Sequence, residues 1–385
     1  MSHWVCGWDI GGAHLKWALR DPSGGWVQVR QVPCPLWRGV DTLARAFEGA
    51  TRDWPVAPQA VRHAATMTGE LVDAFASRAA GVAAIVDCAE TVWPGTRWRW
   101  FGLDGRLADA DTVRREPLRA ASANWLASAS CAARHTDGLF IDIGSTTTDI
   151  VALAGGAARP RALSDGERMS AGELVYRGIV RTPLMAVAAG IDWRGAHRPL
   201  MAEHFATSAD IFRLTGDLDE SADAWPAADG ADKTAMGSAR RLARLIGEDL
   251  ESANLDDWRS VAAQLAEAMT ATLVVAARKV LDAGPAGAGA SRDASAGCAA
   301  GSPATSATGA YVPDVPPPDN AARRVVCAGT GHWLAARVAA RLGLPAVDFA
   351  ALVGAAGVAG AREHAPALAV AELAAAQDDE HPPAG

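Results

Sequence analysis

Hydrophobic and polar residues alternate along the start of the chain in a pattern that predicts strands. Apolar runs at 4–10 and 15–20 flank a glycine-rich turn and predict a hairpin, and 24–33 predicts a third strand. Apolar residues then recur with helical spacing over 41–50, with Asp41 as the expected N-cap. The chain therefore begins with an antiparallel sheet followed by a helix.

Two further segments extend this first sheet. Residues 60–71 predict a strand that runs into a turn, with a helix from Glu70 onwards, and 82–88 predicts another short strand. A second sheet is expected from Asp137, with strands in "GLFIDIG" and "DIVALAGG" and a continuation at 160–164.

Helical spacing dominates from about 166 to 260. Helices are predicted at 239–253 and 256–284, the second with Asp256 or Asp257 as its N-cap and Gly284 at its end. Apolar residues form a single stripe along one face of this second helix. This stripe indicates core packing rather than a cofactor site. Residues 323–343 then predict a strand, a glycine turn and a helix.

Residues 284–320 differ in composition from the rest of the chain. Gly, Ala, Ser and Pro dominate, and large apolar side chains are nearly absent. Such a segment buries too little surface to offset its ordering entropy, so it predicts a disordered insertion. We expect a tail at 376–385.

The length of 385 residues favours two domains. We place an N-terminal lobe at 1–136 and a C-terminal lobe at 137–375, the latter with the helical insertion at about 166–260 and the disordered insertion. The predicted fold class is α/β, with two lobes around a cleft.

Charge and cysteine usage narrow the function classes. The net charge is −8 and no basic stripe is visible, so a nucleic-acid partner is not expected. No apolar run reaches the ~18 residues of a membrane helix, and no signal peptide precedes the first strand. The six cysteines are scattered without a CxxC pair, which indicates reduced thiols in the cytoplasm and no zinc site.

One short motif occurs twice. "CGWDIGGAHLKWAL" and "FIDIGSTTTDIVAL" align at an offset of 133 residues, which places Asp9 on Asp142 and Gly11 on Gly144. Because both motifs fall in a strand–turn–strand setting, they predict two related lobes whose turns face each other.

The motif suits a metal-bound polyphosphate. Carboxylates at strand ends, Asp9 and Asp142, can hold a hydrated Mg²⁺, and glycine turns let backbone N–H groups approach phosphate oxygens. The expected phosphate-binding residues are Gly11, Gly12, Lys16, Gly144, Ser145, Thr146 and Thr147. The alternative is a pair of tight hairpins with solvated aspartates.

Further candidates line the predicted cleft. Gly329, Thr330 and Gly331 form a third turn that could seat a nucleoside, or could only join a strand to a helix. In "TMTGEL", Thr66, Thr68 and Glu70 follow a strand, although Thr68 could be only an N-cap and Glu70 a first-turn residue.

Three more residues have competing interpretations. In "GELVYRGIVRTP", Glu173 is a candidate base and Arg181 a candidate diphosphate contact, and the alternative is a capped surface helix. His14, in the first glycine turn, is a weaker candidate for a substrate contact. The acidic run at 215–233 is interpreted as a solvated loop.

These motifs resemble a known group. The paired D-I-G turns and "AGTG" are similar to the phosphate and adenosine motifs of the superfamily of acetate and sugar kinases, heat-shock proteins and actin. "GWDIGGAHLK", "ATMTGEL", "IDIGSTTTDI" and "GELVYRGIVRTP" resemble, more narrowly, hydantoinase/oxoprolinase-related proteins of tetrahydromethanopterin-linked one-carbon metabolism. The resemblance covers roughly 4–283 and 322–375, and it implies two ribonuclease-H-like (actin-like ATPase) lobes.

The resemblance also implies a chemistry. The methanofuran-biosynthesis synthases of this group are transferases in which a tyramine- or tyrosine-type phenol displaces pyrophosphate from a furanmethanol diphosphate. It implies Mg²⁺ as cofactor, with Asp142 and Glu173 as catalytic residues, and a small-molecule diphosphate and a phenolic acceptor as partners. Two alternatives stay open: an ATP-dependent kinase or hydantoinase/oxoprolinase-type hydrolase, and a non-catalytic nucleotide sensor. A homodimer is compatible with the sequence.

Overall fold

The structure is a computed structural model that describes residues 3–284 and 323–380. The insertion predicted at 284–320 therefore lies outside the described residues except for Gly284. The tail predicted from 376 is helical as far as Glu380, and its remainder lies outside them as well.

The first sheet has the strand order β3-β2-β1-β4-β5-β6. Neighbours among β1, β2 and β3 are antiparallel, whereas β4 runs parallel to both β1 and β5. The bounds are β1 Trp4–Ile10, β2 His14–Arg20, β3 Trp26–Pro33, β4 Val61–Met67, β5 Trp98–Phe101 and β6 Leu107–Ala108. This order and these directions are those of a ribonuclease-H fold.

The second sheet repeats the arrangement. Its order is β10-β8-β7-β13-β14, with β7 antiparallel to β8 and parallel to β13. The bounds are β7 Gly138–Ile143, β8 Thr148–Ala154, β9 Ala157–Ala158, β10 Leu174–Val175, β13 Arg324–Ala328 and β14 Ala346–Asp348. The two-lobed α/β fold expected from the duplicated motif is therefore confirmed.

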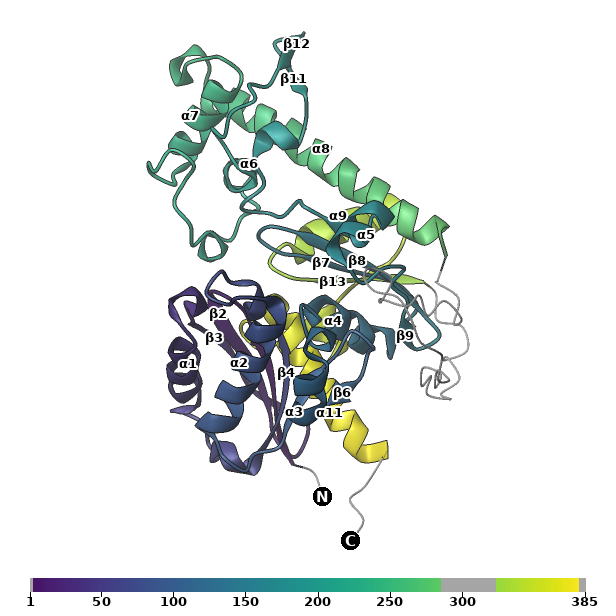
Figure 1. Cartoon of the computed structure of the whole chain (residues 1–385). Helices are drawn as coiled ribbons and strands as arrows, with labels where there is room; N and C mark the ends of the chain where they lie inside the picture. Colours follow the sequence, from purple (N-terminus) through teal and green to yellow (C-terminus); the bar gives the residue numbers. More distant parts are fainter. Residues whose placement is uncertain (1–2, 285–322, 381–385) are drawn as a thin grey trace, which may run out of the picture.

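Helices cover both faces of each sheet, so that the molecule is layered (Figure 1). Helices α1 and α2 pack on the outer face of the first sheet, and α8 (Leu255–Asp282) and α9 pack on the outer face of the second. Helices α4 and α11 lie between the sheets, where one core cluster draws residues from both. The bounds are α1 Asp41–Thr51, α2 Arg78–Val92, α3 Ala110–Arg115, α4 Asn124–Ala133, α5 Asp165–Ala171, α9 His332–Leu342, α10 Phe349–Leu352 and α11 Ala365–Glu380.

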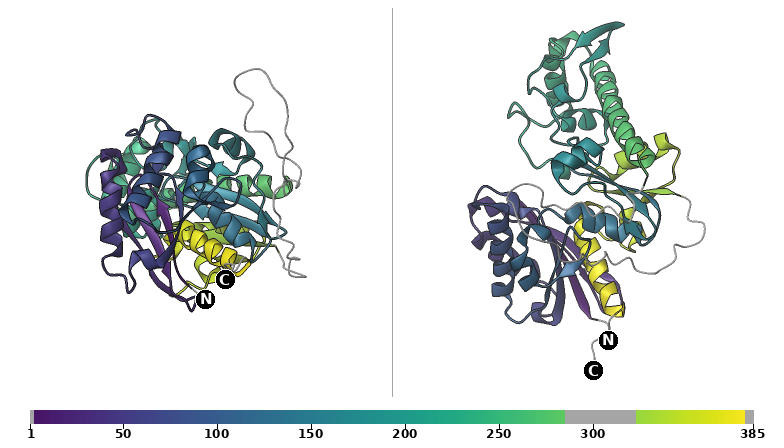
Figure 2. Two further views of the ribbon diagram at one scale, coloured as in Figure 1. Left: turned by 60° about the horizontal axis from the view of Figure 1, so that its bottom comes forward. Right: turned by 45° about the vertical axis from the view of Figure 1, so that its right-hand side comes forward.

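The last helix of the chain, α11, returns to the first sheet and packs along β1 (Figure 2). The approach requires Gly7, because a Cβ at this position would overlap the backbone carbonyl oxygen of Ala367. Asp9 lies two residues after Gly7 and therefore on the same inner face of the sheet. Phe140 packs in the inner cluster of the second sheet, so Asp142 likewise lies on an inner face.

A largely helical region extends from the second sheet, away from the first (Figure 1). It comprises the hairpin β11 Gly190–Trp193 and β12 Ala196–Pro199, then α6 Ser208–Thr215, α7 Ala235–Leu245 and α8 Leu255–Asp282. Among the described residues, α8 is long and apolar enough to cross a membrane by composition. Its apolar stripe is nevertheless buried against neighbouring helices, as the prediction of core packing requires.

Several local predictions are wrong. Residues 82–88 lie inside α2 because Val82, Ile85, Val86 and Ala89 form one buried helical face. No helix begins at Glu70, where only the 3-10 turn Gly69–Leu71 forms. Residues 160–164 form no strand.

Helix boundaries also shift. The helix predicted at 239–253 ends at Leu245. The N-cap of α8 is Asn254, whose side chain accepts hydrogen bonds from the backbone N–H groups of Asp256 and Asp257. Asp41 is the first residue of α1 rather than its cap.

Candidate functional site

The two D-I-G turns have the same hydrogen bond and the same register. Gly11 N–H donates to His14 O at 3.0 Å, and Gly144 N–H donates to Thr147 O at 2.9 Å. These partners keep the offset of 133 residues found in the sequence. Duplicated local sequence therefore produces duplicated local structure.

The register pairs each aspartate with a charged residue. Asp9 lies opposite Lys16 in the first hairpin, and Asp142 lies opposite Asp149 in the second. Lys16 and Asp149 thus occupy equivalent positions with opposite charge. The first aspartate has its counterion in its own hairpin, whereas the second faces another carboxylate.

Asp9 is buried and only partly satisfied. Lys16 Nζ lies 3.2 Å from Asp9 Oδ2, whereas Asp9 Oδ1 has no hydrogen-bond partner among the described residues. Thr66, which lies beside Asp9 on β4, also has a buried hydroxyl without a partner there. A buried oxygen of this kind is a candidate contact for a cation or a donor that only a ligand supplies.

Asp142 belongs to the same electrostatic cluster. Burial, Asp149 and Asp9 raise the pKa of Asp142 and Lys16 lowers it, and together they bring it to about 7. Because Asp9 and Lys16 act on the pKa of Asp142, the side chains of the two turns lie near one another. A raised pKa next to a second carboxylate is typical of a position that a cation stabilises.

The third glycine turn closes on Asp142. Gly329 has φ +82°, and a Cβ there would overlap Asp142 Oδ1. Gly331 N–H donates to Ile143 O at 2.8 Å, and Thr330 has a buried hydroxyl without a partner among the described residues. This turn therefore joins β13 to α9, and it also packs directly against the Asp142 carboxylate.

The remaining phosphate candidates lie on the second turn. Ser145, Thr146 and Thr147 are partly exposed, and Ser145 Oγ lies 3.4 Å from Thr146 Oγ1. Behind them, Gly178 is required because a Cβ would overlap the backbone at Ser145 and Thr146. The turn is thus held from behind while its hydroxyl side stays accessible.

The "TMTGEL" residues adjoin the first turn. The Thr68 backbone N–H donates to Ile10 O at 3.0 Å, and its side chain makes no capping hydrogen bond. Gly12, although partly exposed, has little room for a side chain, since a Cβ would lie 2.7 Å from Val72 Cγ1. Glu70 is buried and accepts a hydrogen bond of 2.6 Å from Ser122 Oγ.

Glu173 and Arg181 do not lie on a capped surface helix. Residues 173–181 form no helix, and their only regular element is the two-residue strand β10. Glu173 is fully buried, and its Oε1 accepts from the Arg161 backbone N–H at 2.7 Å. Burial raises the pKa of Glu173, and its charged neighbours are Arg168 and Arg161. Its contacts thus lie behind Asp149 rather than at the turns.

Sequence reasoning missed three residues of the site. Asp149, which is equivalent to Lys16 by the same offset, could have been found from the repeat. Arg168 donates to Asp149 Oδ1 at 2.8 Å and lies over the Trp125 ring. The third residue is His364, which directly precedes α11. Burial, and to a lesser extent Lys16, lowers the pKa of His364 to about 4. No pattern in its alanine-rich surroundings identifies this histidine.

The carboxylates of the two turns form an incomplete set of metal ligands. No group of three or more His, Cys, Asp or Glu side chains gathers at a metal-binding distance within residues 3–284 and 323–380. The two aspartates can therefore supply only part of a coordination shell. A Mg²⁺ ion fits this arrangement, since it usually keeps several waters and binds through one or two carboxylates together with substrate phosphates.

Comparisons with known proteins agree with the motif analysis. One relative, the (4-{4-[2-(gamma-L-glutamylamino)ethyl]phenoxymethyl}furan-2-yl)methanamine synthase of Methanocaldococcus jannaschii, is 28% identical over 259 residues, 67% of this chain and 76% of the relative. The protein of the same name from Methanococcus vannielii is 29% identical over 124 residues, 32% of this chain and 55% of that protein.

A solved structure is similar over the whole chain. Component A of (R)-2-hydroxyglutaryl-CoA dehydratase from Acidaminococcus fermentans covers 98% of this chain and 100% of its own, with a TM-score of 0.46 and 10% identity. The sequence profile of the hydantoinase/oxoprolinase family matches residues 62–375, most of the described chain. The chain belongs to the hydantoinase/oxoprolinase family.

Proposed function

We propose that this protein is a transferase of methanofuran-type biosynthesis in one-carbon metabolism. In the proposed reaction a phenolic acceptor displaces diphosphate from a furanmethanol diphosphate and forms an aryl ether. The observation that carries the proposal is the pair of neighbouring turns, with Lys16 beside Asp9 and with Asp142 in the same electrostatic cluster. Such a pair suits a diphosphate because each turn can bind one end of it.

In this proposal Asp9 and Asp142 hold a Mg²⁺ ion, which would neutralise charge on the diphosphate. Two observations support this assignment: Asp9 Oδ1 has no hydrogen-bond partner in the part of the chain that the structure describes, and the pKa of Asp142 is raised. Lys16 and the hydroxyls of the second turn supply further positive charge and donors.

The chain's own groups stabilise the leaving group. The bond from the furan CH₂ to the diphosphate oxygen breaks, a bond from the same carbon to the phenol oxygen forms, and the phenol proton is released. Negative charge therefore accumulates on the diphosphate, where the turns and Lys16 lie. ATP is not consumed in this reaction, and we propose the cytoplasm as its location from the cysteine argument alone.

The names of the relatives support the same chemistry. Both describe a product in which a phenoxymethyl group joins an aromatic arm to a furan. Two proteins similar to this chain therefore have a name that matches the proposed product. The two glycine turns would bind the diphosphate that the reaction releases.

The test supplies the full-length protein with Mg²⁺, a furanmethanol diphosphate and tyramine. We expect an ether product by mass spectrometry together with pyrophosphate release in equal amount. ADP formed in step with a phosphorylated product would instead support a kinase, and ADP with a ring-opened amide would support a hydrolase. Diphosphate binding without any product would leave the sensor as the better explanation.

A further inference from the structure

Two exposed tryptophans from different parts of the chain line one cavity. Its volume is about 300 Å³, and it lies beside the first glycine turn. The lining residues are Ala13, His14, Pro33, Pro35, Trp37, Arg38, Ala224 and Trp225. Trp37 comes from the 3-10 helix Leu36–Arg38 after β3, and Trp225 from the loop before α7.

The exposure of these two side chains is unusual in this protein. All fourteen tryptophans lie in the described residues, and only Trp37, at 50%, and Trp225, at 47%, are exposed. Exposed tryptophan that faces a cavity is typical of a binding site, because its large flat surface is available to a ligand ring.

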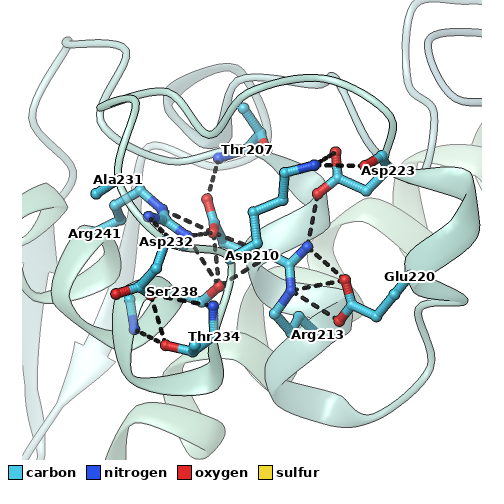
Figure 3. Close-up of polar contacts among 12 residues, drawn as sticks. Thr207, Asp210, Arg213, Glu220, Asp223, Ala231, Asp232, Thr234, Ser238 and Arg241 are labelled. Atoms are coloured by element: carbon cyan, nitrogen blue, oxygen red, sulfur yellow. Dashed lines mark hydrogen bonds and ion pairs between the residues drawn. The ribbon is translucent and has the colours of Figure 1, made fainter.

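The Trp225 loop is anchored on its N-terminal side. Asp223 Oδ2 accepts a hydrogen bond of 2.6 Å from Arg213, and Lys233 Nζ lies 3.5 Å from Asp223 Oδ1 (Figure 3). Both Arg213 and Asp223 have buried side chains. The backbone two residues before Trp225 is therefore held by a buried ion pair.

The same loop is anchored on its C-terminal side. Arg241, which is buried, pairs with Asp229 at 3.1 Å and donates to Asp232 O at 3.0 Å. Arg241 also binds Asp210 Oδ1 at 2.7 Å, which ties the loop to α6 and α7 (Figure 3). The acidic run is a loop with mostly exposed residues, as predicted, but Asp223 within it is buried and the loop is anchored on both sides of Trp225.

The Trp225 ring is also held directly. The Arg181 guanidinium carbon lies 5.1 Å from the ring centroid, a cation–π contact. The Arg181 backbone N–H in turn donates to Ser145 O at 2.9 Å, in the second glycine turn. The ring position is therefore coupled to the turn that is proposed to hold diphosphate.

The geometry points to an aromatic slot between Trp37 and Trp225 that binds the ring of the phenolic acceptor, with Trp225 fixed by Asp223, Arg213 and Arg181. This inference rests on the proposed function. An oxygen that displaces a diphosphate attacks the carbon from the side opposite the leaving group. The acceptor ring must therefore lie beyond the glycine turns, and the cavity lined by His14 and Trp37 adjoins the first of these turns.

Arg38 suggests what the acceptor carries. It is exposed and lines the cavity, so that its guanidinium can pair with an anion on a ligand. A phenol with a carboxylate at the far end of its side chain matches this charge. Arg38→Ala should therefore weaken the binding of a γ-glutamyl amide of tyramine more than the binding of tyramine.

The test compares Trp225→Ala, Trp225→Phe and Leu118→Ala in the full-length protein. Leu118 is an exposed apolar residue that does not line the cavity. We expect Trp225→Ala to raise the KM for tyramine about tenfold while the KM for the furanmethanol diphosphate stays the same. Trp225→Phe should retain most of the affinity, and Leu118→Ala should match the wild type.

A further variant tests the anchor of the loop while the Trp225 side chain stays unchanged. Asp223→Asn removes the charge that Arg213 and Lys233 bind, so it should raise the KM for tyramine without changing kcat. Circular dichroism checks that the variant is folded. An unchanged KM in a folded Asp223→Asn protein would overturn the positioning role.

Binding measured without turnover keeps this inference separate from the proposed function. Saturation-transfer NMR with tyramine, in the presence of Mg²⁺ and pyrophosphate, should detect binding to the wild type and a loss in Trp225→Ala. If no ether forms but this binding is seen, the slot stands and the reaction is wrong. If Trp225→Ala leaves tyramine binding unchanged, or raises only the KM for the diphosphate substrate, the slot is overturned.

Discussion

Lys16 Nζ lies 3.2 Å from Asp9 Oδ2, and the same ammonium lowers the pKa of Asp142 in the second turn. Burial and Asp149 raise the pKa of Asp142 to about 7, while Lys16 lowers it. One side chain of the first lobe thus pairs with Asp9 and also lowers the pKa of Asp142. Its position is fixed by the register that pairs it with Asp9.

Replacing Lys16 by Met should weaken diphosphate binding and change its pH dependence. Loss of the ammonium removes a direct contact with phosphate and lets the pKa of Asp142 rise above 7. We expect about tenfold weaker binding of Mg²⁺-pyrophosphate at pH 7, measured by calorimetry. Lys279→Met, on the surface of α8 away from the turns, is the matched control and should bind normally.

Asp9→Asn and Asp142→Asn should each reduce Mg²⁺-dependent diphosphate binding by about 100-fold, since metal sites lose 10–100-fold even when an outer partner is removed. The amide keeps the side-chain volume, so the fold should persist. Calorimetry with pyrophosphate, with and without Mg²⁺, measures the effect, and Asp53→Asn at an exposed position is the control. Unchanged affinity in both site variants would mean that the turns are only structural.

Asp142→Asn should also make the protein without ligand more stable at alkaline pH. The folded state raises the pKa of Asp142 to about 7, above its ordinary value of 3.8, so the stability it contributes is complete at low pH and is lost as the pH rises through 7. The amide does not ionise. The variant should therefore melt at a higher temperature than the wild type at pH 8, and this difference should vanish near pH 4.

His63 should produce the opposite pH dependence. Burial lowers the pKa of His63 to about 4, with Trp8 Nε1 donating to Nδ1 at 3.0 Å and Pro58 O lying 2.9 Å from Nε2. Because the unfolded state binds the proton first, stability is present above pH 6.5 and is lost as the pH falls towards 4. Urea unfolding between these values should show a smaller pH dependence for His63→Gln.

The control for His63 is His204→Gln, at an exposed position. This variant should keep the pH dependence of the wild type. If His63→Gln and the wild type lose stability in parallel as the pH falls, other groups cause the loss, and His364, whose pKa burial also lowers to about 4, is then the next to test.

The sequence predicted what depends on local repetition. The offset of 133 residues predicted two related strand–turn–strand units, and the structure gives both the same register and the same glycine hydrogen bond, because such geometry is encoded within a few residues. The short apolar run at 82–88 was misread as a strand, since periodicity over seven residues does not separate a buried strand from a helix. In the structure, residues 78–92 form one helix, and the buried positions within 82–88 lie on a single face of it.

Long-range contacts could not be predicted in this way. His364 reaches the neighbourhood of Asp9 only because α11 returns across β1, which no local pattern records. The pairing of Asp223 with Arg213 likewise depends on how the loop folds back onto α6. Charges in an acidic run look alike in sequence, and only tertiary packing decides which of them are buried.

Gly329→Ala tests the wall of the site most directly. A Cβ at this position would overlap Asp142 Oδ1 and the Ile143 carbonyl oxygen, and the residue also has φ +82°. Two costs follow: backbone strain of about 1–3 kcal/mol, and displacement of the aspartate. We expect a lower melting temperature together with loss of Mg²⁺-dependent pyrophosphate binding.

Gly354→Ala separates these two costs. Gly354 has φ +72°, but a Cβ there would meet no atom of residues 3–284 and 323–380 within 4 Å, so the variant carries the backbone strain alone. It should lose stability in calorimetric melting yet bind pyrophosphate as the wild type does. Because only Gly329 contacts Asp142, a binding defect in Gly329→Ala that Gly354→Ala lacks must come from the moved carboxylate. Equal binding in both variants would show that the position of Asp142 does not control diphosphate affinity.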